Sequence, residues 1–160
     1  RRSSDLSKSI KMNTSLANMK GVSNGKVIDA DKEYAVAEDY RKKLKTKCPS
    51  VEQNVGNLSG GNQQKVLLAK WMFTEPDILI LDEPTRGIDV GAKYEIYCII
   101  NDLVAAGKSV IMISSELPEV LGMSDRIYIM NEGKFVGEVG KEEATSELIM
   151  SKIVKSGKGA

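Results

Sequence analysis

The feature that most constrains the fold is an alternation of strand and helix patterns that begins at Leu58. Continuous apolar runs such as "DILILDEP" and "SVIMIS" have the length of strands. The segments between them carry apolar residues at helical spacing, and "VGAKYEIYCIINDLVAAG" ends at Gly107, a residue type that commonly terminates helices. This alternation predicts an α/β domain with a mainly parallel sheet, whose interior strands are covered on both faces.

The residues before this alternation are polar and predict an N-terminal helical portion. We expect a helix through "KEYAVAEDYRKKLKTK", capped by Asp29 or Asp31 and ended by Pro49. A last helix is expected over residues 141–155. The expected division of the chain is into a helical subdomain portion, an α/β core, and a C-terminal helix with tail, at residues 1–57, 58–140 and 141–160.

Composition narrows the class of protein. A chain of 160 residues that is 41% hydrophobic can form one globular domain, and its net charge of +1 argues against a nucleic-acid partner. Cys48 and Cys98 lie far apart and histidine is absent, so neither a disulfide framework nor a metal-binding motif is indicated. No apolar run reaches the roughly 20 residues that cross a bilayer. We therefore expect a cytoplasmic protein.

The stretch "LSGGNQQK" opens a predicted helix with two consecutive glycines. Glycine inside a helix costs about 1 kcal/mol relative to alanine, so a compensating role is expected. The first amides of a helix are unpaired and attract anions, and glycines let a phosphate approach the backbone closely. The hydroxyl of Ser59 can either cap the helix or donate to a phosphate oxygen.

The strand in "ILILDEP" ends in two acidic residues, Asp82 and Glu83. Ligands of parallel sheets bind beyond the carboxyl ends of the strands, where such carboxylates can hold a hard cation or a water molecule. Asp89 follows a few residues later and is expected to cap the next helix.

Taken together, "LSGGNQQK", "ILILDEP", "GIDV" and "MISSELPEV" resemble the signature motif, Walker B motif, D-loop and switch region of the ATP-binding cassette (ABC) ATPases, in order and spacing. The fuller text resembles the carboxyl-terminal cassette of double-cassette ATPases that power bacterial importers of ribose, xylose and galactose type. The resemblance implies a partial P-loop NTPase fold of the ABC type. It also implies an ATP-hydrolysing subunit that energises monosaccharide import from the inner face of the membrane.

The resemblance further implies roles for individual residues. Asp82 would hold Mg²⁺ through water, Glu83 would polarise the water that attacks the γ-phosphate, and Asp89 would lie at the interface between cassettes. The signature residues would bind ATP held by the opposite cassette: Ser59, Gly60, Gly61, Asn62 and Gln63. The implied partners are a second cassette, transmembrane permease subunits and, indirectly, a sugar-binding protein.

Two features depart from the family pattern. The Gly-x-x-x-x-Gly-Lys-Ser/Thr loop is missing, and "AAGKS" is not a substitute, because Asp102 stands where glycine is required. We therefore expect residues 1–160 to correspond to the part of a cassette that follows this loop, and we expect them not to hydrolyse ATP alone. The switch position, commonly histidine, is Ser115. We expect slow turnover at the site served by Glu83, so that the site served by the signature motif is the main hydrolytic one.

Two alternative functions remain open at the level of sequence. A DNA-acting ABC ATPase of the chromosome-maintenance type approaches its signature through a long coiled coil, and residues 1–57 show no heptad pattern. A regulatory or non-transport cassette that drives no permease is the stronger alternative, because the switch histidine is absent.

Overall fold

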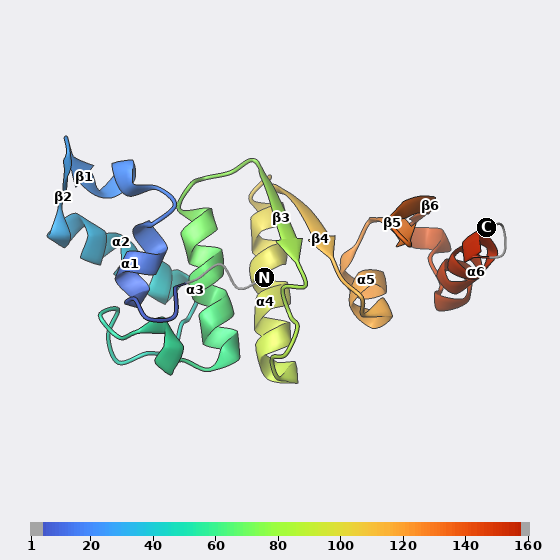
Figure 1. Cartoon of the computed structure of the whole chain (residues 1–160), viewed down its shortest axis with the longest axis horizontal. Coiled ribbons are helices and arrows are strands. Elements are labelled where there is room, and N and C mark those ends of the chain that lie inside the picture. Colours follow the sequence, from blue (N-terminus) through green and yellow to red (C-terminus); the bar gives the residue numbers. More distant parts are fainter. Residues whose placement is uncertain (1–4, 158–160) are drawn as a thin grey trace. The chain divides into compact units, whose positions relative to one another are not determined.

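The computed structural model describes residues 5–157 and contains two compact units, which meet in sequence between Ile111 and Met112 (Figure 1). The elements up to that boundary, which β4 crosses, are α1 (Ile10–Ser15), η1 (Met19–Val22), β1 (Ser23–Asn24), β2 (Val27–Ile28), α2 (Ala30–Lys43), η2 (Val55–Asn57), α3 (Gly60–Met72), β3 (Ile78–Asp82), α4 (Val90–Ala105) and β4 (Ser109–Ile113). The second unit continues with α5 (Leu117–Met123), β5 (Arg126–Asn131), β6 (Lys134–Gly140), η3 (Lys141–Glu143) and α6 (Ser146–Gly157).

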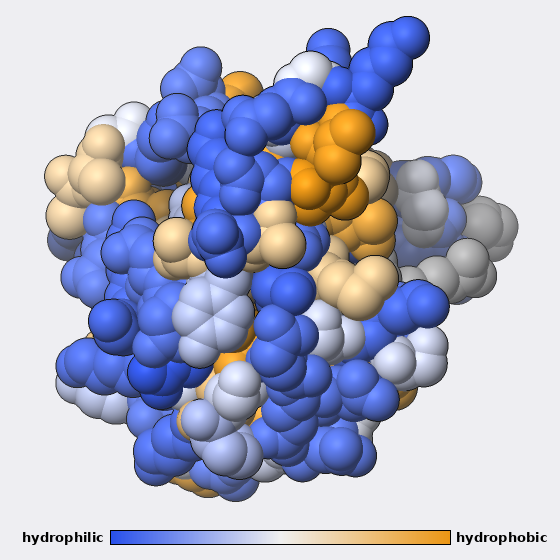
Figure 2. Space-filling model, turned by 90° about the vertical axis from the view of Figure 1, so that its left-hand side faces the viewer, coloured by the Kyte–Doolittle hydropathy of each residue, from blue (hydrophilic) through white to orange (hydrophobic). Residues whose placement is uncertain are grey.

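A buried apolar cluster joins the N-terminal helices of the first unit to α3. Its members come from α1, α2, the segment before α3 and α3 itself: Ile10, Ala37, Val51, Val55, Leu58 and Val66. The half-buried Cys48 packs against them. Because of this cluster, the beginning of α3 is held in place by residues that precede it in the chain. On the outside, hydrophilic side chains cover most of the face shown in Figure 2.

Helix α2 confirms one predicted boundary and corrects the other. The Asp29 carboxylate accepts hydrogen bonds from the backbone N–H groups of Asp31 and Lys32, both at 3.1 Å, so Asp29 is the N-cap. The helix ends at Lys43, before Pro49, because Lys45 adopts a left-handed backbone conformation with φ of 51°. The predicted end at Pro49 was wrong.

Strands β3 and β4 form a two-stranded sheet, and their arrows run in the same direction in Figure 1. The expectation that the strand in "DILILDEP" is covered on both faces was wrong for the described residues. Leu79 is 9% exposed, whereas Ile78 and Ile80 on the other face are 61% and 63% exposed. Since successive side chains of a strand point to opposite faces, only one face of β3 is buried.

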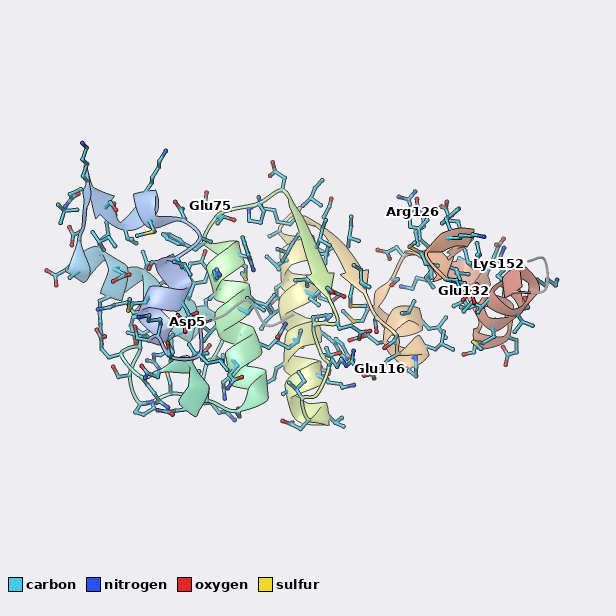
Figure 3. The ribbon with its side chains drawn as sticks, viewed as in Figure 1. Asp5, Glu75, Glu116, Arg126, Glu132 and Lys152 are labelled. Carbon is cyan, nitrogen blue, oxygen red and sulfur yellow. The ribbon has the colours of Figure 1, made fainter. Side chains whose placement is uncertain are left out.

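The second unit is built on the antiparallel pair β5–β6, which turns through Glu132 and Gly133, both with positive φ. Its core consists of Ile127, Ile129, Val139 and Ile149. On α6, the side chain of Lys152, labelled in Figure 3, runs over Gly137. The predicted continuous helix over 141–155 is instead the short 3-10 turn η3 followed by α6, with Ala144 in an extended conformation between them.

The compact units do not coincide with the predicted segments 1–57, 58–140 and 141–160, and that division stays a prediction. Of the described residues, 5–157, none belongs to a helix that is long and apolar enough to span a membrane.

Candidate functional site

The "LSGGNQQK" stretch forms the start of α3. Ser59 is the N-cap residue by position, with an extended backbone conformation, but its side chain makes no capping hydrogen bond. Of the two roles that the sequence left open for this hydroxyl, capping is therefore excluded. Gly60 opens the helix, so the first amides of α3 are those of the glycines and Asn62, which carry the positive end of the helix dipole.

The two glycines have a packing role inside this chain. A Cβ atom added to Gly61 would lie 2.5 Å from the Cβ of Ala92 on α4. Two carbon atoms that are not bonded to each other do not approach this closely. A Cβ on Gly60 would lie 3.3 Å from the Cγ2 of Ile88. The glycines thus allow α3 to pack directly against the start of α4, a role that sequence reasoning missed.

Asn62 joins the start of α3 to the segment after α2. Its Oδ1 accepts a hydrogen bond of 2.9 Å from the backbone N–H of Lys47, and its Nδ2 donates one of 2.9 Å to the Oγ of Ser59. The neighbouring Gln63 donates from Nε2 to the carbonyl of Leu58 at 3.0 Å. The side-chain amides of Asn62 and Gln63 are therefore both engaged by the protein.

A hollow of about 260 Å³ lies at this helix start. It brings together four of the predicted site residues: Ser59, Gly61, Asn62 and Asp89. Its other lining residues are Lys47, Gly91, Ala92 and Glu95. Asp89 caps α4, as predicted, because its Oδ1 accepts from the backbone N–H of Ala92 at 2.9 Å. The signature stretch and the "GIDV" stretch thus share one polar surface.

A buried lysine joins three segments that surround the hollow. Lys65 on α3 is 2% exposed, and its Nζ donates to the carbonyl of Lys45 at 3.1 Å and pairs with Glu95 on α4 at 2.9 Å. The hydrogen bond from Lys65 lowers the pKa of the Glu95 carboxyl, and the charge of Lys47 acts in the same direction. Sequence reasoning missed Lys65, because a lysine is almost never fully buried unless paired.

Lys47, from the segment after α2, also belongs to the surface of the hollow. Its role depends on a left-handed turn at Lys45, which returns the chain toward α3. A lysine just after a helix carries no sequence signal for such a return.

The acidic residues at the end of β3 lie outside the hollow's lining. Asp82 is the exposed last residue of β3, and Glu83 is half-buried. Glu83 has φ of 49°, in the left-handed region, and is followed by the buried Pro84 and Thr85. Such a conformation costs a non-glycine residue about 1–3 kcal/mol and tends to occur at functional sites.

Ser115 lies in the second compact unit, exposed, in the bend between β4 and α5. The preceding Ser114 accepts a hydrogen bond at its Oγ from the backbone N–H of Glu116, which is labelled in Figure 3, at 3.0 Å. The bend that carries Ser115 is thereby held by its own neighbours at the start of α5.

No group of three or more histidine, cysteine, aspartate or glutamate side chains within residues 5–157 is arranged to hold a metal ion by itself. A cation at Asp82 would therefore need ligands from elsewhere. Mg²⁺ commonly binds in that way, through one or two carboxylates together with phosphate oxygens and water.

Comparison with known proteins identifies the family. A family model described as ABC transporter matches residues 2–86, which is more than half of the chain. The chain therefore belongs to the ABC transporter family, as its motifs predicted. A solved structure, a nucleotide-free ATP-binding cassette from an ABC transporter, matches with a TM-score of 0.77 at 24% identity and covers 96% of this chain and 64% of that chain. The predicted ABC-type α/β fold is confirmed.

Closer relatives in sequence are sugar-transport proteins. The L-arabinose transport ATP-binding protein AraG of Geobacillus stearothermophilus is 58% identical over 151 residues, 94% of this chain and 29% of that protein. The ribose import ATP-binding protein RbsA of Clostridium tetani (strain Massachusetts / E88) is 56% identical over 146 residues, 91% of this chain and 29% of that protein. The chain spans less than a third of the length of these relatives.

Proposed function

We propose that this chain is part of an ATP-hydrolysing subunit that energises import of a monosaccharide through an ABC transporter. One observation carries the proposal: three signature residues (Ser59, Gly61 and Asn62) line a single hollow together with Asp89, while the acids at the end of β3 do not line it. Two separate half-sites suit a protein in which each cassette completes the nucleotide site of another. The similarity to arabinose- and ribose-transport proteins supports a monosaccharide as the transported substrate.

The start of α3 would bind the γ-phosphate of ATP held by a second cassette. The first amides of α3 and the hydroxyl of Ser59 supply donors for phosphate oxygens, and the helix dipole favours negative charge there. Gly60 and Gly61 keep this surface free of side chains. Asn62 and Gln63 hold the backbone and the hydroxyl in position, and Asp89 borders the same surface at the interface between cassettes.

The end of β3 would serve this chain's own nucleotide site. Asp82 is exposed and suited to bind Mg²⁺ through water, with ATP phosphates supplying further oxygens. Bound there, Mg²⁺ would neutralise developing phosphate charge. Glu83 would accept the proton of the attacking water, and a positioned general base contributes a factor of about 10² to 10⁴ in rate.

Ser115 would occupy the switch position of that site. A serine carries no charge and is shorter than histidine, so it provides weaker stabilisation of the γ-phosphate. We infer that the site of Glu83 turns over slowly and that the site completed by Ser59 to Gly61 carries most hydrolysis.

The proposed partners follow from this function. They are a second cassette, transmembrane permease subunits and, indirectly, a sugar-binding protein, with the ATPase bound peripherally to the inner face of the membrane. The named function of the relatives supports these partners, since both are described as transport or import ATP-binding proteins.

The test compares two variants of a full-length ATPase that carries this chain. Glu83→Gln is expected to leave most ATPase activity, whereas the equivalent change in the other cassette removes most of it. If Glu83→Gln alone abolished hydrolysis, the assignment of the slow site would be wrong.

A regulatory cassette without a permease is the second candidate, favoured by Ser115 at the switch position. Affinity capture with the tagged ATPase from detergent-solubilised membranes distinguishes the two. Recovery of permease subunits supports the transporter, and a complex without any permease supports the regulatory cassette.

A further inference from the structure

The hydrogen bonds around Asn62 determine which way the Ser59 hydroxyl can donate. A backbone N–H is only a donor, so the atom of Asn62 that faces the N–H of Lys47 at 2.9 Å must be the amide oxygen. The amide nitrogen therefore faces the Oγ of Ser59, also at 2.9 Å. The orientation of the amide follows from the chemistry of its partners.

The consequence falls on the proton of Ser59. An amide nitrogen donates and does not accept, so Ser59 must be the acceptor in this bond. The hydroxyl keeps its own proton for a different partner. Among residues 5–157, no group accepts a hydrogen bond from that hydroxyl, and Ser59 is exposed on the wall of the hollow.

We propose that Asn62 is a positioning residue that presents the Ser59 hydroxyl as a hydrogen-bond donor to a phosphate oxygen in the hollow. This inference rests on the proposed function, in which that phosphate belongs to ATP of a second cassette. Asn62 itself does not touch the phosphate. It restricts the rotation of the hydroxyl, and so reduces the reorientation needed when the cassettes close.

The second bond of Asn62 gives this arrangement its rigidity. Without Lys47, the amide could rotate by half a turn and present its oxygen to Ser59, which would draw the hydroxyl proton inward. The bond to the Lys47 backbone prevents this rotation, because the rotated amide would place two donors face to face. The backbone of the segment after α2 thereby controls a hydroxyl on α3.

A double-mutant cycle in the full-length ATPase tests the proposal. Asn62→Ala is expected to lower kcat for ATP hydrolysis about tenfold, less than the factor of about 10² expected for Ser59→Ala, since the latter removes the donor itself. In the Ser59→Ala background, Asn62→Ala should change kcat less than twofold, because it acts only through the hydroxyl. Equal losses in both backgrounds would overturn the proposal.

Two further variants exclude a merely structural effect. Asn62→Asp keeps the shape of the side chain, and one carboxylate oxygen can still accept the hydrogen bond from the Lys47 N–H. The second oxygen, however, accepts a hydrogen bond from the Ser59 hydroxyl, whose proton then points toward Asp and away from the phosphate. It should lower kcat more than Asn62→Ala, whereas a structural role predicts the smaller loss for the isosteric change. Asn101→Ala, the same substitution at an exposed position of α4 outside both proposed half-sites, should leave kcat and KM unchanged.

The outcomes separate this inference from the proposed function. If Ser59→Ala leaves hydrolysis unchanged, the phosphate-binding role proposed for the signature motif is refuted. If Ser59→Ala lowers kcat and Asn62→Ala does not, the phosphate-binding role stands and only the positioning role of Asn62 is refuted.

Discussion

The start of α3 and the end of β3 both carry predicted site residues, but they are built differently. At the start of α3, residues from three separate segments support the site: Lys47, Ser59, Lys65, Asp89 and Glu95. At the end of β3, Asp82 is exposed, Glu83 has a left-handed backbone, and one face of the strand is open. The first site is held by tertiary contacts within this chain, whereas the second is strained and only partly covered.

The two proposed half-sites should therefore respond to substitutions in different places. Substitutions on other elements can disturb the site at the start of α3, since several of its supporting residues lie there. The β3 site depends on the backbone at Glu83 itself. Four substitutions or conditions test this contrast.

The largest effect is expected for Lys65→Ala. The change removes the packing of a buried side chain and leaves the carbonyl of Lys45 without its partner, so the free energy of unfolding should fall by about 3 kcal/mol. Urea unfolding followed by Trp71 fluorescence measures the change. Lys32→Ala on the exposed surface of α2 is the matched control and should change stability by less than about 0.5 kcal/mol. A small effect of Lys65→Ala would show that α3 and α4 hold together without it.

Gly61→Ala is expected to cost about 1–2 kcal/mol of stability. Overpacking against Ala92 outweighs the better helix propensity of alanine. The double variant Gly61→Ala with Ala92→Gly returns the space and should recover most of the loss. If it recovers none, the glycine is needed for a reason other than the contact with α4.

Glu83→Gly should increase stability, in contrast to the two preceding substitutions, while it removes the proposed general base. Relief of the left-handed backbone should raise the free energy of unfolding by about 0.5 kcal/mol, net of glycine's entropy in the unfolded chain. Glu75→Gly is the control, because Glu75 has a similar φ of 52° outside the site. It should give the same gain in stability and leave the proposed general base in place. Loss of stability in Glu83→Gly would contradict strain at this residue.

The smallest effect is a dependence on acid pH from Glu95. Its pKa is lowered in the folded chain by the hydrogen bond from Lys65, so the stabilisation is present above the ordinary value of 4.5 and is lost as the pH falls through the lowered pKa. Glu95 is 46% exposed, so the contribution should stay below about 1 kcal/mol. Unfolding measured between pH 6 and about pH 3 should show a shallower loss in Glu95→Gln than in the parent chain.

Much of the site could be predicted because its motifs are local. The order of strands and helices, the caps at Asp29 and Asp89, and the placement of Ser59 at a helix start all follow from residues a few positions apart. Capping and helix termination act over one turn, so the sequence contains the information needed. The end of α2 was predicted wrongly, because the left-handed turn at Lys45 comes before the stronger signal of Pro49.

The sequence by itself determined the family and the α/β class, and it supplied the residues of the two proposed half-sites. Only the tertiary structure decided that Gly61 packs against Ala92, that Lys65 is buried between α3 and α4, and that Asn62 joins Lys47 to Ser59. The physical reason is distance along the chain. These contacts pair residues of different elements, and a short-range pattern does not specify which long-range partner completes a hydrogen bond or fills the space above a glycine.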